Sequence, residues 1–162
     1  MQNLPDSYNN ISDLDYFHLY ADAMFNSHQI AIMEGNAQQA LSILTHLEQL
    51  MIRHIRDEED LLLPPYREKI PTVPAGGAIE FYQREHRQIG SFLRRFIDHQ
   101  PFNQNEISIV HYFDMCTMYK DLTEHHHARE RTFLYRLLDR KLVMQEKRKI
   151  LDTFTKHQIN AD

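Results

Sequence analysis

The sequence predicts an all-α protein: an antiparallel up-down-up-down four-helix bundle with an additional C-terminal helix. Apolar residues recur at three- and four-residue spacing through four long segments, which is the period of a helix with one buried face. Prolines and glycines gather between these segments, and no stretch has the alternation or the hairpin turns typical of strands. Because most links are short, consecutive helices are expected to be antiparallel neighbours.

Length and charge limit the classes of protein to consider. The 162 residues suit one domain with a core over about 12–140 and an extra amphipathic helix over 141–157. The net charge of -5, with acidic and basic residues intermixed, argues against a nucleic-acid partner. No apolar run approaches the roughly 18 residues of a membrane span, and the first residues lack a leader, so we expect a soluble, cytoplasmic protein without a membrane partner. With Cys116 alone, no internal disulfide forms, and a packed core thiol is expected there.

The first predicted helix begins at about Asp13. Ser12 and Asp15 have the spacing of a capping box, and Glu34-Gly35-Asn36 ends the helix. Its buried face is expected to carry Leu14, His18, Ala21, Phe25, His28 and Ile32.

The second predicted helix follows at once, with Asn36 as its cap. We expect it to stop at Pro64-Pro65, because proline lacks an amide donor and its ring clashes with the preceding turn. The segment 66–77 is then the longest connection of the bundle. The buried face of this helix reads Leu44, Leu47, Met51, His54, Glu58 and Leu61.

The third helix should begin near Ala78 and end before Pro101, and the fourth should follow a turn over 100–108 and reach about Arg140. The face of the third reads Ile79, Tyr82, His86, Ile89, Leu93 and Phe96. That of the fourth reads Tyr112, Cys116, Tyr119, Thr123, His126, Glu130, Phe133 and Leu137. The last amphipathic helix packs on the bundle or, as the alternative, on a second copy in a homodimer.

Two His-x3-Glu pairs stand on these buried faces, His54 with Glu58 and His126 with Glu130. Residues four apart share one side of a helix, so each pair presents an imidazole and a carboxylate to the same point. A lone pair of this kind is usually a surface contact, but a buried carboxylate requires a charged partner or a metal. The two faces together therefore predict a metal site inside the bundle.

Height along the bundle selects the partners of these pairs. His54 lies 19 residues after Gly35, and His18 lies 17 before it, whereas His28 lies only 7 before it. At 1.5 Å per residue, His18 should meet His54, while His28 should be a hydrogen-bonded core or boundary residue. The same reasoning brings His86 to the level of His126 within about one turn. The candidate metal ligands are His18, His54, Glu58, His86, His126 and Glu130.

Other polar residues lie near these candidate ligands in the sequence. Of the triple histidine at 125–127, only His126 is expected to face the core, because neighbours on a helix are separated by about 100°. Glu85 is predicted to be a solvated flank of His86, with a role on an iron or proton path as the alternative, and Arg129 belongs to a solvated face. Glu59 is a candidate for orienting a ligand. The remaining histidines are expected at the surface or boundary: His46, His99, His111 and His157.

With these motifs in order, the chain resembles the hemerythrin-like family, also called the HHE cation-binding domain. The matching text is His18, His54-x3-Glu58-Glu59 followed by Leu-Leu-Leu-Pro, Glu85-His86, and His126-x3-Glu130, over about residues 12–140. The resemblance implies two non-haem iron ions bridged by the two glutamates and by an oxo or hydroxo group. The donors alone would also suit manganese or zinc.

The sequence departs from the oxygen-carrying members, which have another histidine on the third helix. Positions four residues either side of His86 are Tyr82 and Gly90. With four histidines, each metal keeps an open position, so both are expected to be accessible. The set is closer to that of the iron-sulfur cluster repair di-iron proteins, although their cysteine-bearing N-terminal segment has no counterpart in this sequence.

Three functions fit this reading. The first is a di-iron protein that binds or senses a small ligand such as oxygen, nitric oxide or peroxide. The second is an enzyme of nitric oxide or peroxide reduction or of cluster repair, which needs an electron donor protein. The third is a metal-free helical scaffold. A ferritin-like centre would require Glu-x-x-His on two helices, and only Glu124-x-x-His127 fits, off the predicted face.

Overall fold

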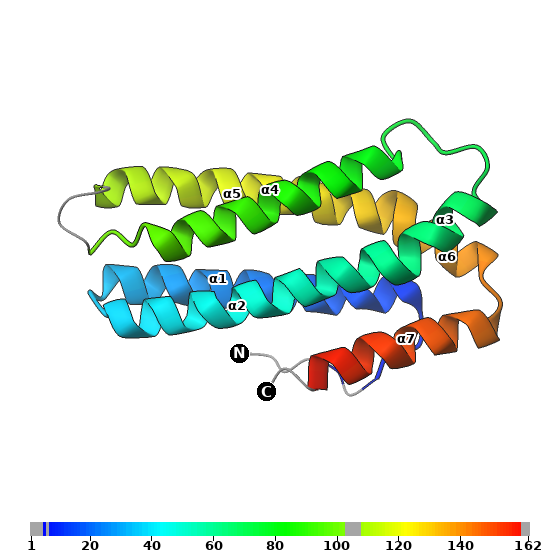
Figure 1. The fold of residues 1–162 in the computed structure, drawn as a ribbon, viewed down its shortest axis with the longest axis horizontal. Helices are drawn as coiled ribbons and strands as arrows, with labels where there is room; N and C mark the ends of the chain where they lie inside the picture. The colour runs from blue at the N-terminus through cyan, green and yellow to red at the C-terminus, as the bar shows by residue number, and fades with distance from the viewer. Residues whose placement is uncertain (1–4, 6, 103–107, 160–162) are drawn as a thin grey trace.

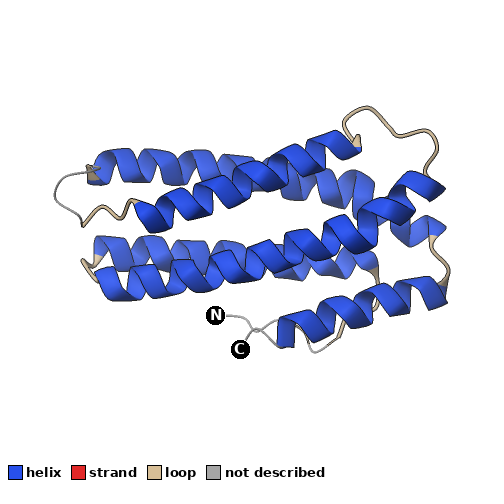
Figure 2. Cartoon of the chain, viewed as in Figure 1, coloured by secondary structure: helices blue, strands red, loops and turns tan. Residues whose placement is uncertain are grey.

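The computed structural model describes residue 5, residues 7–102 and residues 108–159, and within them it is helical, without a strand (Figures 1 and 2). The elements in chain order are the 3-10 turn η1 (Ile11–Leu14), α1 (Asp15–Met33), α2 (Ala37–Asp57), η2 (Glu58–Leu62), α3 (Leu63–Lys69), α4 (Ile79–Asp98), α5 (Ile109–Arg129), η3 (Glu130–Tyr135), α6 (Arg136–Lys141) and α7 (Met144–Ile159). The predicted all-α class with an additional C-terminal helix is confirmed.

Four long helices run side by side with alternating direction (Figure 1). α1 packs along α2, α2 packs against α4, and α4 packs against α5. The bundle is therefore two antiparallel helix pairs, α1 with α2 and α4 with α5, laid against each other. α7 returns along the outside of the first pair and contacts α2.

The first two helices meet in a tight turn. Gly35 has a φ of +73°, a left-handed conformation that glycine adopts without strain. Asn36 caps α2, because its Oδ1 accepts a hydrogen bond of 3.1 Å from the amide of Gln39. This end of α1 and this start of α2 are as predicted.

The start of the first helix differs from the prediction. Asp13, rather than Asp15, closes the capping box, since its carboxylate accepts from the amide of Asn10 at 2.9 Å. Ser12 instead donates its hydroxyl to Asp139 Oδ2 at 2.6 Å. Asp139 also accepts hydrogen bonds from the backbone amides of Ile11 at 2.8 Å and Ser12 at 3.0 Å. Ser12, which was expected to cap the helix, is therefore bound by α6 instead.

Both helices that carry a His-x3-Glu pair widen into a π-helical turn that begins at the glutamate. η2 starts at Glu58 and η3 at Glu130, and each leads directly into a further α-helix. The prediction that the second helix stops at Pro64-Pro65 is therefore wrong. After the wide turn these prolines occupy the first turn of α3, where the helix does not need their amide hydrogens, and the chain stays helical to Lys69.

Later boundaries follow the sequence more closely. α4 begins after Ala78 and ends at Asp98, and the helical segment that starts at Ile109 ends at Lys141, close to the predicted ends. Most of the predicted turn over 100–108 lies outside the described residues, which exclude 103–107.

Apolar side chains form two clusters at different heights of the bundle. One is built from α1, α2, α4 and α5, with Phe25, Leu44 and Phe96 among its members. The other joins η1, α3, α6 and α7 around Tyr66 and Leu138. In α4, and along α2 and α5 with the π turns that follow them, the candidate ligands fall between residues of these two clusters. The described helices include none long and apolar enough to cross a membrane.

Candidate metal centre

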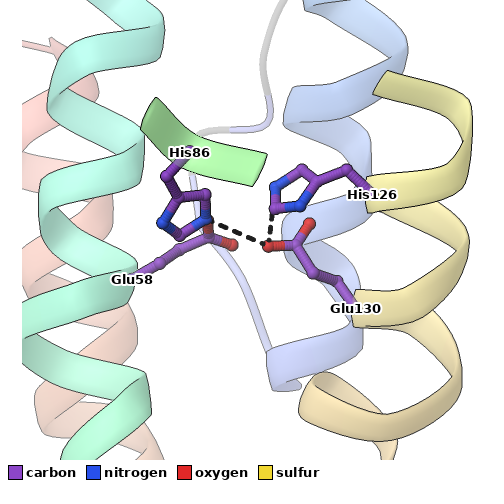
Figure 3. Close-up of side chains that lie close together, drawn as sticks. All are labelled: Glu58, His86, His126 and Glu130. Atoms are coloured by element: carbon purple, nitrogen blue, oxygen red, sulfur yellow. Dashed lines mark ion pairs between the residues drawn. The ribbon is translucent and has the colours of Figure 1, made fainter. Parts of the chain in front are cut away.

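All six candidate ligands are buried, at 4% exposure or less, and they meet in the middle of the bundle. Figure 3 shows four of them: His86 from α4 and His126 from α5 approach the carboxylates of Glu58 and Glu130. His18 from α1 and His54 from α2 lie on the other side of Glu58. His18, and not His28, lies beside His54, as the heights along the helices predicted.

The first group of donors lies between α1 and α2. The Nε2 atoms of His18 and His54 are 3.2 Å apart. His54 Nε2 is 3.3 Å from Glu58 Oε1, and His18 Nε2 is 3.3 Å from Glu130 Oε2. One oxygen of each glutamate therefore faces this histidine pair.

The second group lies between α4 and α5. His126 Nε2 is 3.1 Å from Glu130 Oε1, and His86 Nε2 is 3.7 Å from the same oxygen. His86 Nε2 is also 3.4 Å from Glu58 Oε2. Each glutamate thus turns its second oxygen to this pair, and the two carboxylates lie between two sets of two imidazoles.

Carboxylates on the far side of the rings orient three of the four histidines. His18 Nδ1 lies 3.2 Å from Asp15, His86 Nδ1 lies 2.8 Å from Glu59, and His126 Nδ1 lies 3.1 Å from Glu85. A proton held on Nδ1 leaves the Nε2 lone pair free to bind a metal. His54 is held differently, by stacking on Phe17 with ring centroids 4.0 Å apart. Glu59, which was predicted to orient a candidate ligand, contacts His86.

Charge inside the cluster raises the pKa of two of its histidines, His86 and His126, in the metal-free protein. Burial lowers the pKa of His86, but the nearby negative charges of Glu130 and Glu58 outweigh burial and raise this pKa to about 10. Burial also lowers the pKa of His126, but Glu130 and Glu85 outweigh burial and raise this pKa to about 9. Although burial favours a neutral Glu58, the charges of His54 and His86 keep its pKa well below the usual value.

The hydrogen-bonding groups in the centre do not satisfy one another. Within the described part of the chain, Glu58 Oε2, His86 Nε2 and both oxygens of Glu130 are buried and accept or donate no hydrogen bond. Buried carboxylate oxygens without donors are costly. Imidazole nitrogens and carboxylate oxygens converging in this way fit bound cations. Two groups of these donors could each hold a metal ion. One consists of Glu58, His86, His126 and Glu130, and the other consists of His18, His54 and Glu58.

His127 is buried beside the centre, contrary to the prediction that only His126 of the triple histidine faces the core. Its ring stacks on His18 with centroids 3.8 Å apart and an angle of 3° between the planes. α5 packs against both α1 and α4, so its buried arc is wide enough for two adjacent residues. The sequence spacing could have indicated that His127 is buried, because His127 lies four residues after the buried Thr123.

Glu85 and Arg129 are not the solvated residues that the sequence suggested. Glu85 is only 5% exposed, and besides contacting His126 it accepts from the guanidinium of Arg129 at 3.0 Å. Arg129 also donates to the carbonyl of Gly76. A proline-rich link is thereby tied to the carboxylate that orients His126. Burial raises the pKa of Glu85, but hydrogen bonds from His126 and Arg129 hold it below the usual value.

Tyr135 is a residue of the centre that sequence reasoning missed. Its fully buried hydroxyl donates to Glu58 Oε1 and lies 3.3 Å from His18 Nε2. Tyr135 stands five residues after Glu130, which in a regular helix would turn it to another side. The π turn η3 brings it back, and nothing in the apolar pattern signals that turn.

Two other expectations concern residues away from the centre. His28 donates a hydrogen bond of 2.8 Å from Nδ1 to the carbonyl of Ala40, and its Nε2 lies 2.8 Å from the hydroxyl of Tyr112, as expected of a core histidine. Cys116 is buried and free, also as expected. Burial raises the pKa of its thiol to about 12.

Comparison with known proteins agrees with this geometry. No curated protein and no solved structure matches the chain. The sequence profile of the hemerythrin HHE cation binding domain matches residues 9–109, more than half of the chain. This match includes α1, α2, η2 and α4, which supply His18, His54, Glu58 and His86. The chain belongs to the hemerythrin HHE cation-binding domain family.

Proposed function

We propose that this protein holds two iron ions at His18, His54, Glu58, His86, His126 and Glu130 and binds or senses a small ligand such as oxygen or nitric oxide there. The observation that carries the proposal is the division of donors. Two histidines and one oxygen from each glutamate face one point, and two other histidines and the remaining two oxygens face a second point. Two ions bridged by Glu58 and Glu130 would satisfy all of these groups.

The imidazole and carboxylate donors support a transition metal. They do not distinguish one such metal from another, so the choice of iron rests on the family. Imidazole and carboxylate together suit iron, manganese and zinc, whereas calcium and magnesium prefer oxygen donors alone. Membership in a cation-binding family known for di-iron centres favours iron. When bound, ferrous iron supplies the open position and the electrons with which a diatomic ligand is captured.

The residues of the chain supply the surroundings for such binding. Phe17 and Phe154 pack against the ring of His54, so this side of the centre is apolar and excludes water. Asp15, Glu59 and Glu85 hold three imidazoles with their Nε2 atoms directed inward. Preformed ligands reduce the cost of ordering the site when the metal enters.

Metal analysis tests the proposal directly. Protein reconstituted anaerobically with ferrous iron should contain about two irons per chain, as the two donor groups require, and should develop near-ultraviolet absorption in air. Stoichiometric adducts with oxygen or nitric oxide, without turnover in the presence of a reductant, support a binding or sensing protein. Continuous consumption of the ligand would identify an enzyme instead. A reconstituted protein without bound iron would contradict the proposal and favour a helical scaffold.

A further inference from the structure

We propose that the phenol oxygen of Tyr135 is an additional protein donor to the metal held by His18 and His54, so that exogenous ligands bind at the metal held by His86 and His126. This inference rests on the proposed two-metal function. It adds a residue that the His/Glu motifs do not contain, and it assigns different tasks to the two metal positions.

The position of the hydroxyl is the first observation. Tyr135 reaches the middle of the bundle from η3, and its oxygen contacts Glu58 Oε1 and His18 Nε2. These atoms are two of the donors of the first group. The ring of Tyr135 also lies against that of His18, with centroids 5.9 Å apart, so packing fixes the direction of the hydroxyl.

The spacing of these atoms is the second observation. Metal bonds to nitrogen and oxygen are about 2.1 Å long, so neighbouring donors around one octahedral ion lie about 3 Å apart. In the first group, His18 Nε2 is 3.2 Å from His54 Nε2 and 3.3 Å from Glu130 Oε2, and the Tyr135 oxygen is 3.3 Å from the same nitrogen. The phenol oxygen thus has the spacing of a fellow ligand and not of a more distant support.

The count of donors then differs between the two positions. The first has two imidazoles, one oxygen from each glutamate and the Tyr135 oxygen. A bridging solvent oxygen would complete an octahedron there. The second has two imidazoles and two carboxylate oxygens, so the same bridge leaves one position open. With Tyr135 included, the expectation that both metals are accessible gives way to a single open metal.

Binding of the phenol involves a proton. Coordination to a ferric ion would release the hydroxyl proton to solvent and give a phenolate, without any change in the oxidation state of the protein. A ferric phenolate absorbs visible light and enhances the resonance Raman ring modes of tyrosine, and these ring modes do not arise from imidazole, carboxylate or oxo ligands. The proposal can therefore be tested by spectroscopy, independently of any activity.

The experiment compares the wild-type protein with Tyr135→Phe and Tyr82→Phe after loading with iron and oxidation in air. Tyr82 is the matched control, because it is also fully buried and lies near the centre in the same cluster of apolar residues. We expect a visible phenolate band, and resonance Raman ring modes that shift with ring-deuterated tyrosine, in the wild type and in Tyr82→Phe. Tyr135→Phe should lose both signals while still binding iron.

The outcomes separate this inference from the function on which it rests. Two irons per chain without a phenolate band, or a band that survives Tyr135→Phe, would overturn the role of Tyr135 and leave the di-iron site standing. A band lost in Tyr82→Phe alone would do the same. Protein that binds no iron would overturn both. The isotope shift is measured on the wild type, so a variant that fails to fold does not prevent the test of tyrosine ligation.

Azide titration tests the assignment of the open position. We expect one azide per centre in the wild type, and two in Tyr135→Phe, where removal of the phenol oxygen opens the first metal. Two azides per centre in the wild type would show that both metals are open and would overturn the assignment.

Discussion

Carboxylate side chains have two different tasks around this centre. Glu58 and Glu130 lie between the two histidine pairs, and three of their four carboxylate oxygens, all but Glu58 Oε1, lack a hydrogen-bond donor among the described residues. Asp15, Glu59 and Glu85 instead face the outer nitrogens of the histidine rings. Substitutions in the two sets should therefore differ in the size of their effect on metal binding.

Removal of an inner carboxylate should empty the site. We expect Glu58→Ala to lose most of its bound iron, because each of the two metal positions loses one oxygen donor and the histidines lose their counter-charge. The metal content per chain, measured by elemental analysis, checks this.

His28→Ala is the control, since His28 is buried in the same helix bundle but hydrogen-bonds to Ala40 and Tyr112. It should keep two irons while the free energy of unfolding falls by about 2–4 kcal/mol, from lost hydrogen bonds and a cavity. Loss of iron in His28→Ala with retention in His18→Ala would contradict the placement of the site.

Neutralising an outer carboxylate should weaken the site without abolishing it. Glu85→Gln removes the charge that faces His126 Nδ1, and we expect iron affinity to fall about 10–100-fold, as for other groups that orient metal-bound histidines. Competition with a chelator measures the affinity. Glu80→Gln, on the exposed side of the same helix, should leave affinity unchanged. An equal loss in both variants would point to overall charge as the cause.

The limits of sequence reasoning are clearest at single residues. The six candidate ligands that meet in the centre follow from two spacing rules, because the period and the rise of a helix are regular. Tyr135 was missed, since its position depends on a π turn, and His127 was misplaced, since the width of the buried arc of α5 depends on its neighbours. Glu85 was assigned to solvent because the arginine that covers it lies 44 residues away in the chain.

At the level of helices, the π turns explain why the buried residues beyond Glu58 and Glu130 differ from those predicted. The expected stripes continued through Leu61 in one helix and through Phe133 and Leu137 in the other, but the residues that are fully buried are Leu62, Leu134 and Leu138. A π turn adds one residue to a helix and shifts every later position by one. Helix existence, order and most ends followed from the sequence, whereas the register beyond each glutamate did not.

α7 covers one side of the centre and should protect it. Phe154 on this helix is 1% exposed, and its ring lies 5.7 Å from that of His54. Phe154→Ala should lower the free energy of unfolding by about 3 kcal/mol and should speed the loss of iron to a chelator, because water gains access to His54. Asp152→Ala, an exposed position of α7, is the control. A destabilised variant with an unchanged release rate would show that α7 supports the fold without shielding the metal.

For the whole molecule, the centre lies between two apolar clusters and draws its candidate ligands from α1, α2, α4 and α5 together with the turns η2 and η3. Metal bound there contacts every long helix, so it should stabilise the bundle as one unit. The stabilisation follows mass action and grows with the concentration of free metal above its dissociation constant.

Metal binding should also depend on pH in a defined direction. With a pKa of about 10 for His86 and about 9 for His126, both rings are protonated on both nitrogens and positively charged at pH 7 in the metal-free protein. Each ring must lose one proton before its Nε2 can bind a metal. We expect about two protons to be released per chain at pH 7, and the affinity for metal to rise with pH. Calorimetry in buffers of different ionisation enthalpy measures the release. Binding heats that do not depend on the buffer would contradict this prediction.

The same set of groups occurs once in each half of the chain. α1 and α2 form a helical hairpin with a histidine on its first arm and His-x3-Glu, followed by a wide turn, on its second, and α4 and α5 repeat this plan. Each hairpin therefore contributes half of the six candidate donors. Two identical hairpins related by a twofold axis would already present all six donors, so a self-associating peptide of half this length is a natural starting point for building the site anew.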